Sequence, residues 1–221
     1  MESFRTKHGT FYLGDARELI RRVPSESVDI ILTDPPYGLG TDEYDNPDVF
    51  FEMEDELYRV LKPNSFALFF YAIKHLPRAF ELRRFRYMWM IPAIELSNTK
   101  FVHSRIGTNN YSIILIFAKG KPRPTTSSPD LVFTTDQLPI IDKNVVNELK
   151  KVRGGKQFKN TSVIATLLMR FTNRGDIVLD PFAGYGSIPL VCEVFRRRWV
   201  AFEIDPSKYA FAQNLLLKVI E

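Results

Sequence analysis

Three polar segments of the sequence carry residue types that could do chemistry together, and each directly follows an apolar run. They are Asp34-Pro35-Pro36-Tyr37, Asp180-Pro-Phe-Ala-Gly-Tyr-Gly-Ser187 and Glu203-Ile-Asp205. If the apolar runs are strands of one parallel sheet, their carboxyl ends meet at one edge, which is where ligands bind in open α/β sheets. The sequence therefore predicts a single site built from segments that are far apart in the chain.

The first segment is a rigid group of hydrogen-bond acceptors. Pro35 and Pro36 restrict the backbone and remove two N–H donors, which leaves the Asp34 carboxylate and the Pro35 carbonyl as acceptors. Two such acceptors can bind both hydrogens of an exocyclic amino group of a nucleobase and direct its lone pair at an electrophile, such as a sulfonium methyl group. Tyr37 can stack on the base, which has to be turned out of its helix. The alternative is a rigid turn that ends a strand.

The other two segments indicate a cofactor that contains a nucleoside. Gly184 and Gly186 stand between an expected strand and an expected helix, where residues without side chains let the backbone approach a ligand. The segment lacks the Gly-Lys-Ser/Thr ending of a phosphate-binding loop, and Pro189 replaces the third glycine of a dinucleotide fingerprint. Glu203 ends the next apolar run, at the spacing where an acid accepts hydrogen bonds from ribose hydroxyls. For the glycines alone, a plain tight turn is the alternative.

The apolar pattern around these segments alternates between strands and helices. We expect strands at 28–33, 65–71, 87–96, 111–118, 177–179 and 199–202, and helices at 16–23, 50–60, 73–84, 161–171, 188–195 and 206–219. Such alternation is typical of an α/β fold with a doubly wound, mostly parallel sheet. We expect 1–221 to form one domain, with a weakly patterned segment at about 119–160 that opens on a proline- and serine-rich stretch.

Composition limits the setting and the partners. The single cysteine, Cys192, excludes an internal disulfide and favours a reducing, cytoplasmic setting, and with only 3 histidines no structural zinc site is expected. The N-terminus lacks the apolar core of a signal peptide, and the longest apolar stretches are too short to cross a bilayer, so no membrane partner is expected. The net charge of +4 favours a polyanion only weakly, and the basic runs around 150–159 and 196–198 are typical of solvated surface as well.

The motifs together resemble those of a known family. Asp-Pro-Pro-Tyr at 34–37, followed much later by Asp-Pro-Phe-x-Gly-x-Gly at 180–186, resembles the DNA amino-methyltransferases that act on adenine N6 or cytosine N4. The order, catalytic segment first and cofactor segment last, is that of their β group. Gly14-Asp15-Ala16 resembles the family's early Gly-Asp motif. The resemblance implies a Rossmann-like methyltransferase fold, a small target-recognition insert at about 119–160, and double-stranded DNA as the partner.

The resemblance also implies roles for individual residues. The catalytic residues would be Asp34, Pro35, Pro36 and Tyr37. The residues that bind S-adenosyl-L-methionine would be Asp15, Ala16, Asp34, Lys159, Asp180, Phe182, Gly184, Gly186, Ser187 and Glu203, with no metal. The chain departs from the family in two places. Of the usual His-Pro-Thr-x-Lys-Pro motif only Lys159 keeps its place, and Tyr185 and Ser187 stand where Ser and Thr are commoner.

Several alternatives stay open at this stage. Methyltransferases of RNA or protein amides use the same catalytic segment, but they usually place the glycine segment first. A DNA-binding subunit without activity would not need Asp34, Tyr37 and Glu203 intact. By the same resemblance, an initial aspartate in the catalytic segment implies adenine N6, whereas serine there implies cytosine N4. A short recognition segment fits a short DNA site or a homodimer on the duplex. Asn109 and Asn110 are candidates for base contact or, alternatively, turn formers.

Overall fold

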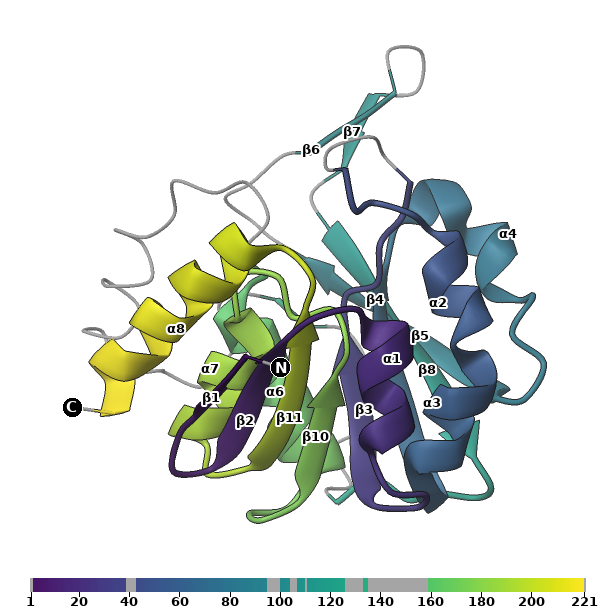
Figure 1. Ribbon diagram of the computed structural model, residues 1–221. Coiled ribbons are helices and arrows are strands. Elements are labelled where there is room, and N and C mark those ends of the chain that lie inside the picture. The colour runs from purple at the N-terminus through teal and green to yellow at the C-terminus, as the bar shows by residue number, and fades with distance from the viewer. Residues whose placement is uncertain are drawn as a thin grey trace.

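The computed structural model describes residues 2–38, 43–94, 100–103, 107–109, 111–125, 133–134 and 159–220. Within them, one large mixed sheet runs through the molecule in the order β1-β2-β11-β10-β3-β4-β8-β5-β9 (Figure 1). Its strands are β1 Ser3–Arg5, β2 Gly9–Leu13, β3 Val28–Thr33, β4 Leu61–Tyr71, β5 Arg86–Ile94, β8 Tyr111–Lys119, β9 Phe133–Thr134, β10 Ile177–Asp180 and β11 Arg198–Glu203. A second, two-stranded sheet pairs β6 Lys100–His103 with β7 Gly107–Asn109.

The centre of the large sheet is parallel. β2, β11, β10, β3 and β4 are parallel neighbours, while β8 runs antiparallel to both β4 and β5. The prediction of a doubly wound, mostly parallel α/β sheet is confirmed. Because the five parallel strands point the same way, all their carboxyl ends lie at one edge of the sheet.

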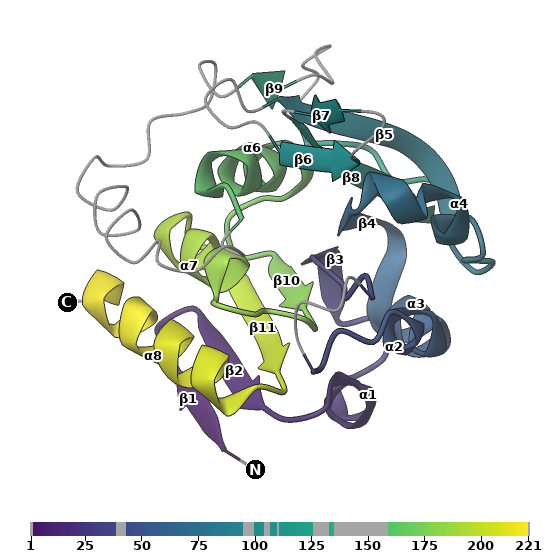
Figure 2. The same cartoon turned by 90° about the horizontal axis from the view of Figure 1, so that it is seen from above.

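Helices cover both faces of the sheet (Figure 2). One layer contains α1 Ala16–Leu19, α2 Asp48–Glu52, α3 Glu54–Val60 and α4 Leu76–Ala79, with 3₁₀ turns at Ile20–Arg22 and Ile73–His75. The other layer contains α6 Thr161–Phe171, α7 Ser187–Val194 and α8 Pro206–Ile220. Side chains of β4 alternate between the two cores: Phe66, Leu68 and Phe70 pack with the α6–α8 layer, and Ala67, Phe69 and Tyr71 pack with the other. Among the described residues, no helix is long and apolar enough to span a membrane.

Most predicted elements are present within one to four residues of their expected bounds, but one helix is much shorter. The expected helix at 73–84 is a 3₁₀ turn followed by α4, which ends at Ala79. The segment after it is held by side chains of α3 instead. Glu54 accepts a hydrogen bond from the backbone N–H of Arg84 at 2.6 Å, and Asp55 pairs with the Arg84 guanidinium at 2.7 Å. The prediction was wrong there because tertiary contacts replaced helical hydrogen bonds.

The expected helix at 50–60 is divided rather than continuous. α2 ends at Glu52, and α3 begins at Glu54 after Met53, whose backbone closes one helix and caps the next. Pro47 is the N-cap of α2. Both helices still bury the same apolar side, because Phe50, Met53 and Leu57 are all almost fully buried.

The N-terminal hairpin of β1 and β2 has no counterpart among the predicted elements. β2 pairs in parallel with β11 and thereby extends the sheet past the strand that ends in Glu203. A buried contact holds it there: Glu193 of α7 accepts hydrogen bonds from Thr6 at 2.6 Å and from the Trp199 indole at 2.8 Å. Only Phe11 of β2 is fully buried, so the strand lacks the apolar signature that marks the others. Its role is to bring Gly14 and Asp15 to the edge of the sheet.

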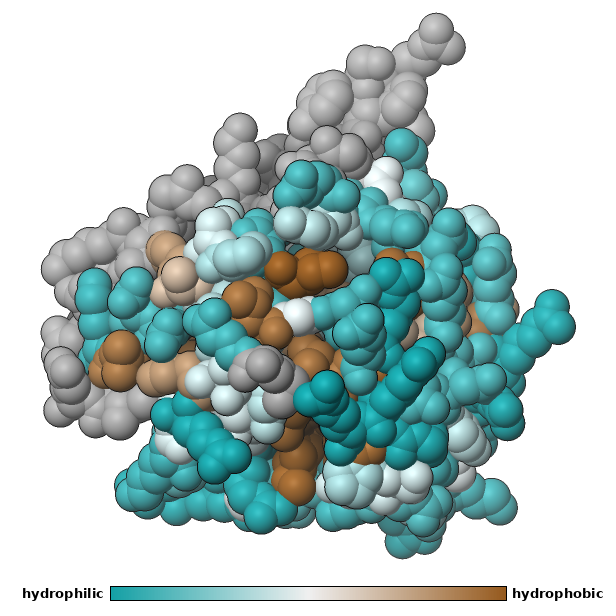
Figure 3. All heavy atoms as spheres, in the orientation of Figure 1, coloured by the Kyte–Doolittle hydropathy of each residue, from teal (hydrophilic) through white to brown (hydrophobic). Residues whose placement is uncertain are grey.

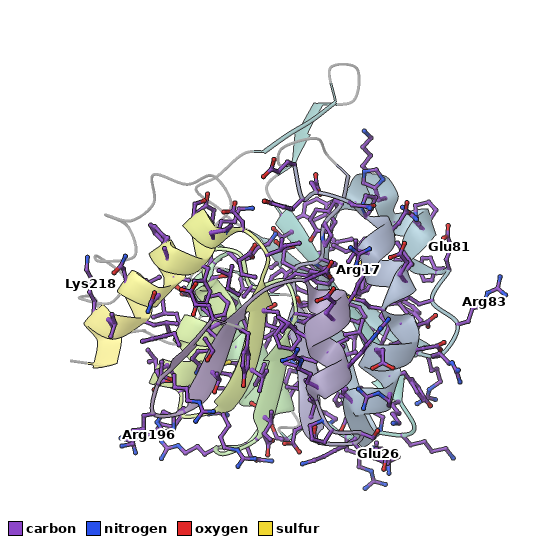
Figure 4. The ribbon with its side chains drawn as sticks, in the orientation of Figure 1. Arg17, Glu26, Glu81, Arg83, Arg196 and Lys218 are labelled. Carbon is purple, nitrogen blue, oxygen red and sulfur yellow. The ribbon has the colours of Figure 1, made fainter. Side chains whose placement is uncertain are left out.

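The basic run Arg196–Arg198 is only partly solvated surface. Arg196 lies at the edge of the sheet opposite the carboxyl ends of the parallel strands (Figure 4). Arg197 is buried, and its guanidinium donates to the Thr172 hydroxyl and to the Thr172 and Phe195 carbonyls, each at 2.9 Å. It therefore ties the end of α6 to the turn between α7 and β11.

We predict that Arg197→Ala destabilises the fold and that Arg198→Ala, the same change at an exposed neighbour, does not. Removing the buried guanidinium leaves carbonyl groups without a donor, at a cost of roughly 2–4 kcal/mol. Urea unfolding followed by circular dichroism measures both variants. Equal midpoints for the two variants would show that the Arg197 contacts contribute nothing to stability.

Candidate active site

The carboxyl ends of four neighbouring parallel strands bring the three chemistry-bearing segments together. The Gly184 backbone N–H, in the glycine loop, donates to Glu203 Oε2 at 2.7 Å, at the end of β11. The Thr33 hydroxyl, which ends β3, donates to Asp180 Oδ1 at 2.6 Å, at the end of β10. On the other side, the N–H of Gly14 donates to the Glu203 carbonyl at 2.8 Å. These segments therefore form one continuous edge, as the parallel alignment predicts.

The two positions of the loop, 184 and 186, require glycine for different structural reasons. Both have left-handed backbones, with φ of +54° at Gly184 and +81° at Gly186. A Cβ at Gly186 would lie 2.7 Å from the Cβ of Ala212, so this glycine allows α7 and α8 to pack closely. Among the described residues, a Cβ at Gly184 would meet nothing within 4 Å. The space beside Gly184 is therefore open to a ligand, and its backbone can be approached closely.

Glu203 is a buried carboxylate held by backbone donors. Its side chain is 7% exposed, and its two oxygens accept from the N–H groups of Gly184 and Asp205, the latter at 2.8 Å. Burial raises the pKa of Glu203 above its ordinary value, and these N–H groups and Lys208 oppose that rise. Each oxygen keeps further acceptor capacity, so the carboxylate is oriented and can still accept from hydroxyl donors.

Asp180 has one carboxyl oxygen satisfied and one buried without a partner. It is 2% exposed, and its Oδ1 accepts from the Thr33 hydroxyl and from the Phe182 N–H at 3.3 Å. Oδ2 is buried and has no hydrogen-bond partner within the part of the chain that the structure describes. Burial raises the pKa of Asp180 from 3.8 to about 8, so the group is largely protonated and neutral at pH 7.

The Asp34 carboxylate is bound on both oxygens. Tyr37 donates its hydroxyl to Asp34 Oδ1, and Lys159 Nζ lies 2.9 Å from Oδ2. Burial and the Asp34 charge raise the pKa of Tyr37 well above its ordinary value, which keeps the hydroxyl a donor. The Tyr37 ring packs edge-on against Tyr71, with centroids 5.7 Å apart. Asp45 holds the loop, because its Oδ1 accepts hydrogen bonds from the N–H groups of Tyr37 and Gly38 at 2.8 Å each.

The remaining predicted site residues differ in exposure. Asp15 caps α1 and pairs with Arg17 at 2.7 Å, which lowers the pKa of Asp15. Figure 4 shows Arg17 at the upper part of α1, toward α2, where it also reaches Glu52 at 3.2 Å. Ala16 is buried in the core and Ser187 is buried at the start of α7. Asp15 and Ala16 follow Gly14 and lead into α1, which lies against the face of the sheet near β3 (Figures 1 and 2).

Sequence reasoning missed several residues that position this site. Thr33, Asp45 and Tyr71 hold Asp180, the catalytic loop and Tyr37 respectively. A hydroxyl at the end of a buried strand was the available signal for Thr33. The target-recognition segment lies mostly outside the described residues, as does Asn110.

On the face shown in Figure 3, which is largely hydrophilic, apolar side chains gather in the middle, between α8 and α1.

Comparison with known proteins decides the family. The family model described as DNA methylase, of the N6/N4 type, matches residues 28–214, which include all three segments. The chain belongs to the N6/N4 DNA methylase family. Its relatives include the type II methyltransferase M.BamHI of Bacillus amyloliquefaciens, 28% identical over 91% of this chain and 56% of the relative. They also include the DNA adenine methyltransferase YhdJ of Escherichia coli (strain K12), 26% identical over 91% of this chain and 80% of the relative.

Solved structures show the same fold. The M1.HpyAVI–SAM complex matches with a TM-score of 0.72 at 21% identity, over 94% of this chain and 98% of that one. The PvuII DNA methyltransferase, described as cytosine-N4-specific, matches with a TM-score of 0.70 at 21% identity, over 97% and 92%. The chain spans 56% of the length of M.BamHI. The fold of this N6/N4 methylase chain is the α/β fold of the S-adenosylmethionine-dependent DNA methyltransferases.

We predict that Gly184→Ala weakens binding of S-adenosylmethionine by about 10-fold or more, because a methyl group would occupy the open space beside the loop. Gly175→Ala is the matched control. Gly175 also has a positive φ, +87°, and a Cβ added there would meet none of the described residues within 4 Å, but it precedes β10 at the opposite edge of the sheet. Both variants strain the backbone, so thermal unfolding should shift in both. Calorimetric titration with the cofactor separates them, and equal affinities would contradict a ligand beside Gly184.

We also predict that Asp180→Asn changes how stability depends on pH. Because the folded pKa, about 8, lies above the ordinary value of 3.8, the folded state binds this proton more tightly than the unfolded chain. The wild-type chain therefore loses this stabilisation as the pH rises from about 4 to 8. The asparagine variant does not titrate, so its unfolding free energy relative to wild type should rise by about 1 kcal/mol per pH unit.

Urea unfolding at several pH values between 5 and 8 measures that difference. Asp55→Asn, the same change at a largely exposed aspartate, is the control. A flat difference for Asp180→Asn would mean that Asp180 is ionised in the folded chain.

Proposed function

We propose that this chain transfers a methyl group from S-adenosyl-L-methionine to the exocyclic N6 amine of adenine in double-stranded DNA. The observation that carries the proposal is the meeting of the Asp34 loop, the glycine loop and Glu203 at one edge of the sheet. A loop that offers acceptors to an amine thus lies beside a loop that offers open space and an oriented carboxylate.

The residues at this edge fit the cofactor. The open space beside Gly184 admits a ligand against the backbone, and Glu203 is oriented to accept from ribose hydroxyls. The unpartnered Asp180 Oδ2 fits a polar group of the same ligand. Bound there, S-adenosyl-L-methionine supplies an electrophilic methyl group on a positively charged sulfur. Phe182, Gly186 and Ser187 complete the loop, and Asp15 and Ala16 extend the edge.

The catalytic loop has to exchange one hydrogen bond to accept the base. Asp34 Oδ1 is occupied by the Tyr37 hydroxyl, so we propose that the target amine replaces this hydroxyl on Asp34. The Pro35 carbonyl accepts the second amine hydrogen, and the released Tyr37 ring stacks on the extruded base. Pro36 has no N–H to compete for either acceptor.

The transfer itself needs no other group. The amine nitrogen bonds to the methyl carbon as the carbon–sulfur bond breaks, and the sulfur keeps the electron pair of that bond. The nitrogen then carries an extra proton, which Asp34 accepts and passes to solvent. Two acceptors held in place raise the electron density on the nitrogen before the transfer and stabilise the positive charge that develops on it.

The preference for adenine rests on Asp34 as the first residue of the catalytic segment. The proteins similar to this chain include one named as a DNA adenine methyltransferase and one described as cytosine-N4-specific, so similarity does not choose between the two amines. Duplex DNA is part of the proposal, with 119–160 as the segment that contacts it. Assembly as a homodimer stays a prediction.

The test is to incubate the purified chain with S-adenosyl-L-methionine and duplex DNA, digest the DNA to nucleosides and analyse them by mass spectrometry. We expect N6-methyladenine. N4-methylcytosine would overturn the adenine preference, and methylation confined to tRNA, rRNA or protein would overturn the DNA substrate.

We predict that Asp34→Ala abolishes transfer and leaves cofactor affinity within about threefold, because the change removes the amine acceptor but not the glycine loop. Asp55→Ala, an exposed aspartate on α3, is the control and should keep full activity. Retained turnover in Asp34→Ala would remove the assignment of Asp34 to the amine.

A further inference from the structure

Lys159 is far from the catalytic loop in sequence, but its side chain contacts that loop in the folded chain. Its Nζ lies 2.9 Å from Asp34 Oδ2, and the two side chains are about equally shielded, at 26% and 25% exposed. The same Nζ lies 5.8 Å from the centre of the Tyr37 ring and 5.4 Å from that of Phe70. Lys159 thus contacts both the charged and the aromatic residue of the catalytic segment.

The start of α6 fixes the position from which Lys159 extends. Asn160, the next residue, is the N-cap of α6, and its side chain accepts from the Ser162 N–H at 3.0 Å. The following helix is anchored in the core by Val163 and Ile164, both almost fully buried. The backbone of Lys159 is therefore held in a defined position next to the capped and buried start of α6, although its own side chain is long.

The groups around Asp34 show what the ion pair with Lys159 contributes. Burial, with a smaller contribution from the Asp34 charge, raises the pKa of Asp180, so that Asp180 is largely neutral at pH 7. Tyr37 offers a hydroxyl without charge. Among the described residues, the cation in direct contact with the Asp34 carboxylate is Lys159. A partly exposed ion pair contributes little to stability, on the order of 1 kcal/mol or less, so its main effect is on orientation and charge.

We propose that Lys159 is a positioning residue that holds Asp34 Oδ2, so that Oδ1 alone is exchanged between the Tyr37 hydroxyl and the target amine. This rests on the proposed function of the site. It differs from the role that resemblance implies for Lys159, which is contact with the cofactor. With Oδ2 held by a cation, the carboxylate cannot rotate when Tyr37 leaves, and the free Oδ1 faces the amine.

The experiment compares Lys159→Met and Lys159→Arg with the wild-type chain. Steady-state methylation of duplex DNA gives kcat, and calorimetry gives the affinity for S-adenosyl-L-methionine. We expect Lys159→Met to lower kcat by about 10- to 100-fold, as for a misoriented catalytic group, while cofactor affinity stays within about threefold. Lys159→Arg, which keeps the cation, should restore kcat to within about fivefold of wild type.

Lys62→Met is the matched control. Lys62 pairs with Asp29 at 2.5 Å and is also partly exposed, but it lies at the start of β4, at the opposite edge of the sheet. Its loss should leave kcat unchanged. Unchanged kcat in Lys159→Met, or a loss of cofactor affinity as large as the loss of kcat, would overturn the proposal in favour of no role or of a cofactor contact.

A double-mutant cycle tests whether Lys159 acts through Asp34. Asp34→Asn keeps an acceptor oxygen but has no charge for Lys159 to hold, so adding Lys159→Met should change its single-turnover rate by less than about twofold. An equal fall in both backgrounds would mean that Lys159 acts elsewhere. If the wild-type chain does not methylate DNA, the proposed function fails first. If it does and Lys159→Met is unaffected, only the present inference fails.

Discussion

The site depends on the parallel pairing of β2, β11, β10 and β3. Parallel strands send all their carboxyl ends to one edge, so residues separated by most of the chain, such as Asp34 and Glu203, come to the same edge, where only β10 separates their strands. The cross-strand contact of Thr33 with Asp180 and the contact of Gly184 with Glu203 then join the ends of adjacent strands. A change of register in any of these strands would displace one segment relative to the others. The chemistry therefore rests on backbone pairing before it rests on any side chain.

Three carboxyl groups lie at this edge, and each is accommodated there in a different way. Glu203 is held by backbone N–H donors, Asp34 by a lysine and a tyrosine hydroxyl, and Asp180 by remaining largely protonated at pH 7. Full ionisation of all three would be costly so close together in a partly buried site. A positively charged cofactor fits an edge of this kind, because its charge offsets the carboxylates when it binds.

Much of this arrangement could be predicted from the sequence because it depends on strong local signals. The run Val28–Thr33 and the helix Thr161–Phe171 were predicted at their observed bounds, since their apolar patterns are continuous and cleanly ended. The short N-terminal strands were missed because one buried residue, Phe11, is too weak a periodic signal. Helix α4 was overestimated because side chains of α3, distant in sequence, hold the residues that follow it.

The site residues also divide into those with a local sequence signal and those that depend on contacts across the fold. Asp34, Gly184 and Glu203 were predictable because each follows an apolar run within a recognisable motif. The partners that set their behaviour were not, because they depend on contacts across the fold: Thr33 against Asp180, and Lys159 against Asp34. Sequence motifs thus name the candidate groups, while the three-dimensional structure shows what binds each of their oxygens. This matters most for Asp34, because both of its oxygens are occupied. Releasing Oδ1 from the neutral Tyr37 hydroxyl costs less free energy than releasing Oδ2 from the Lys159 cation.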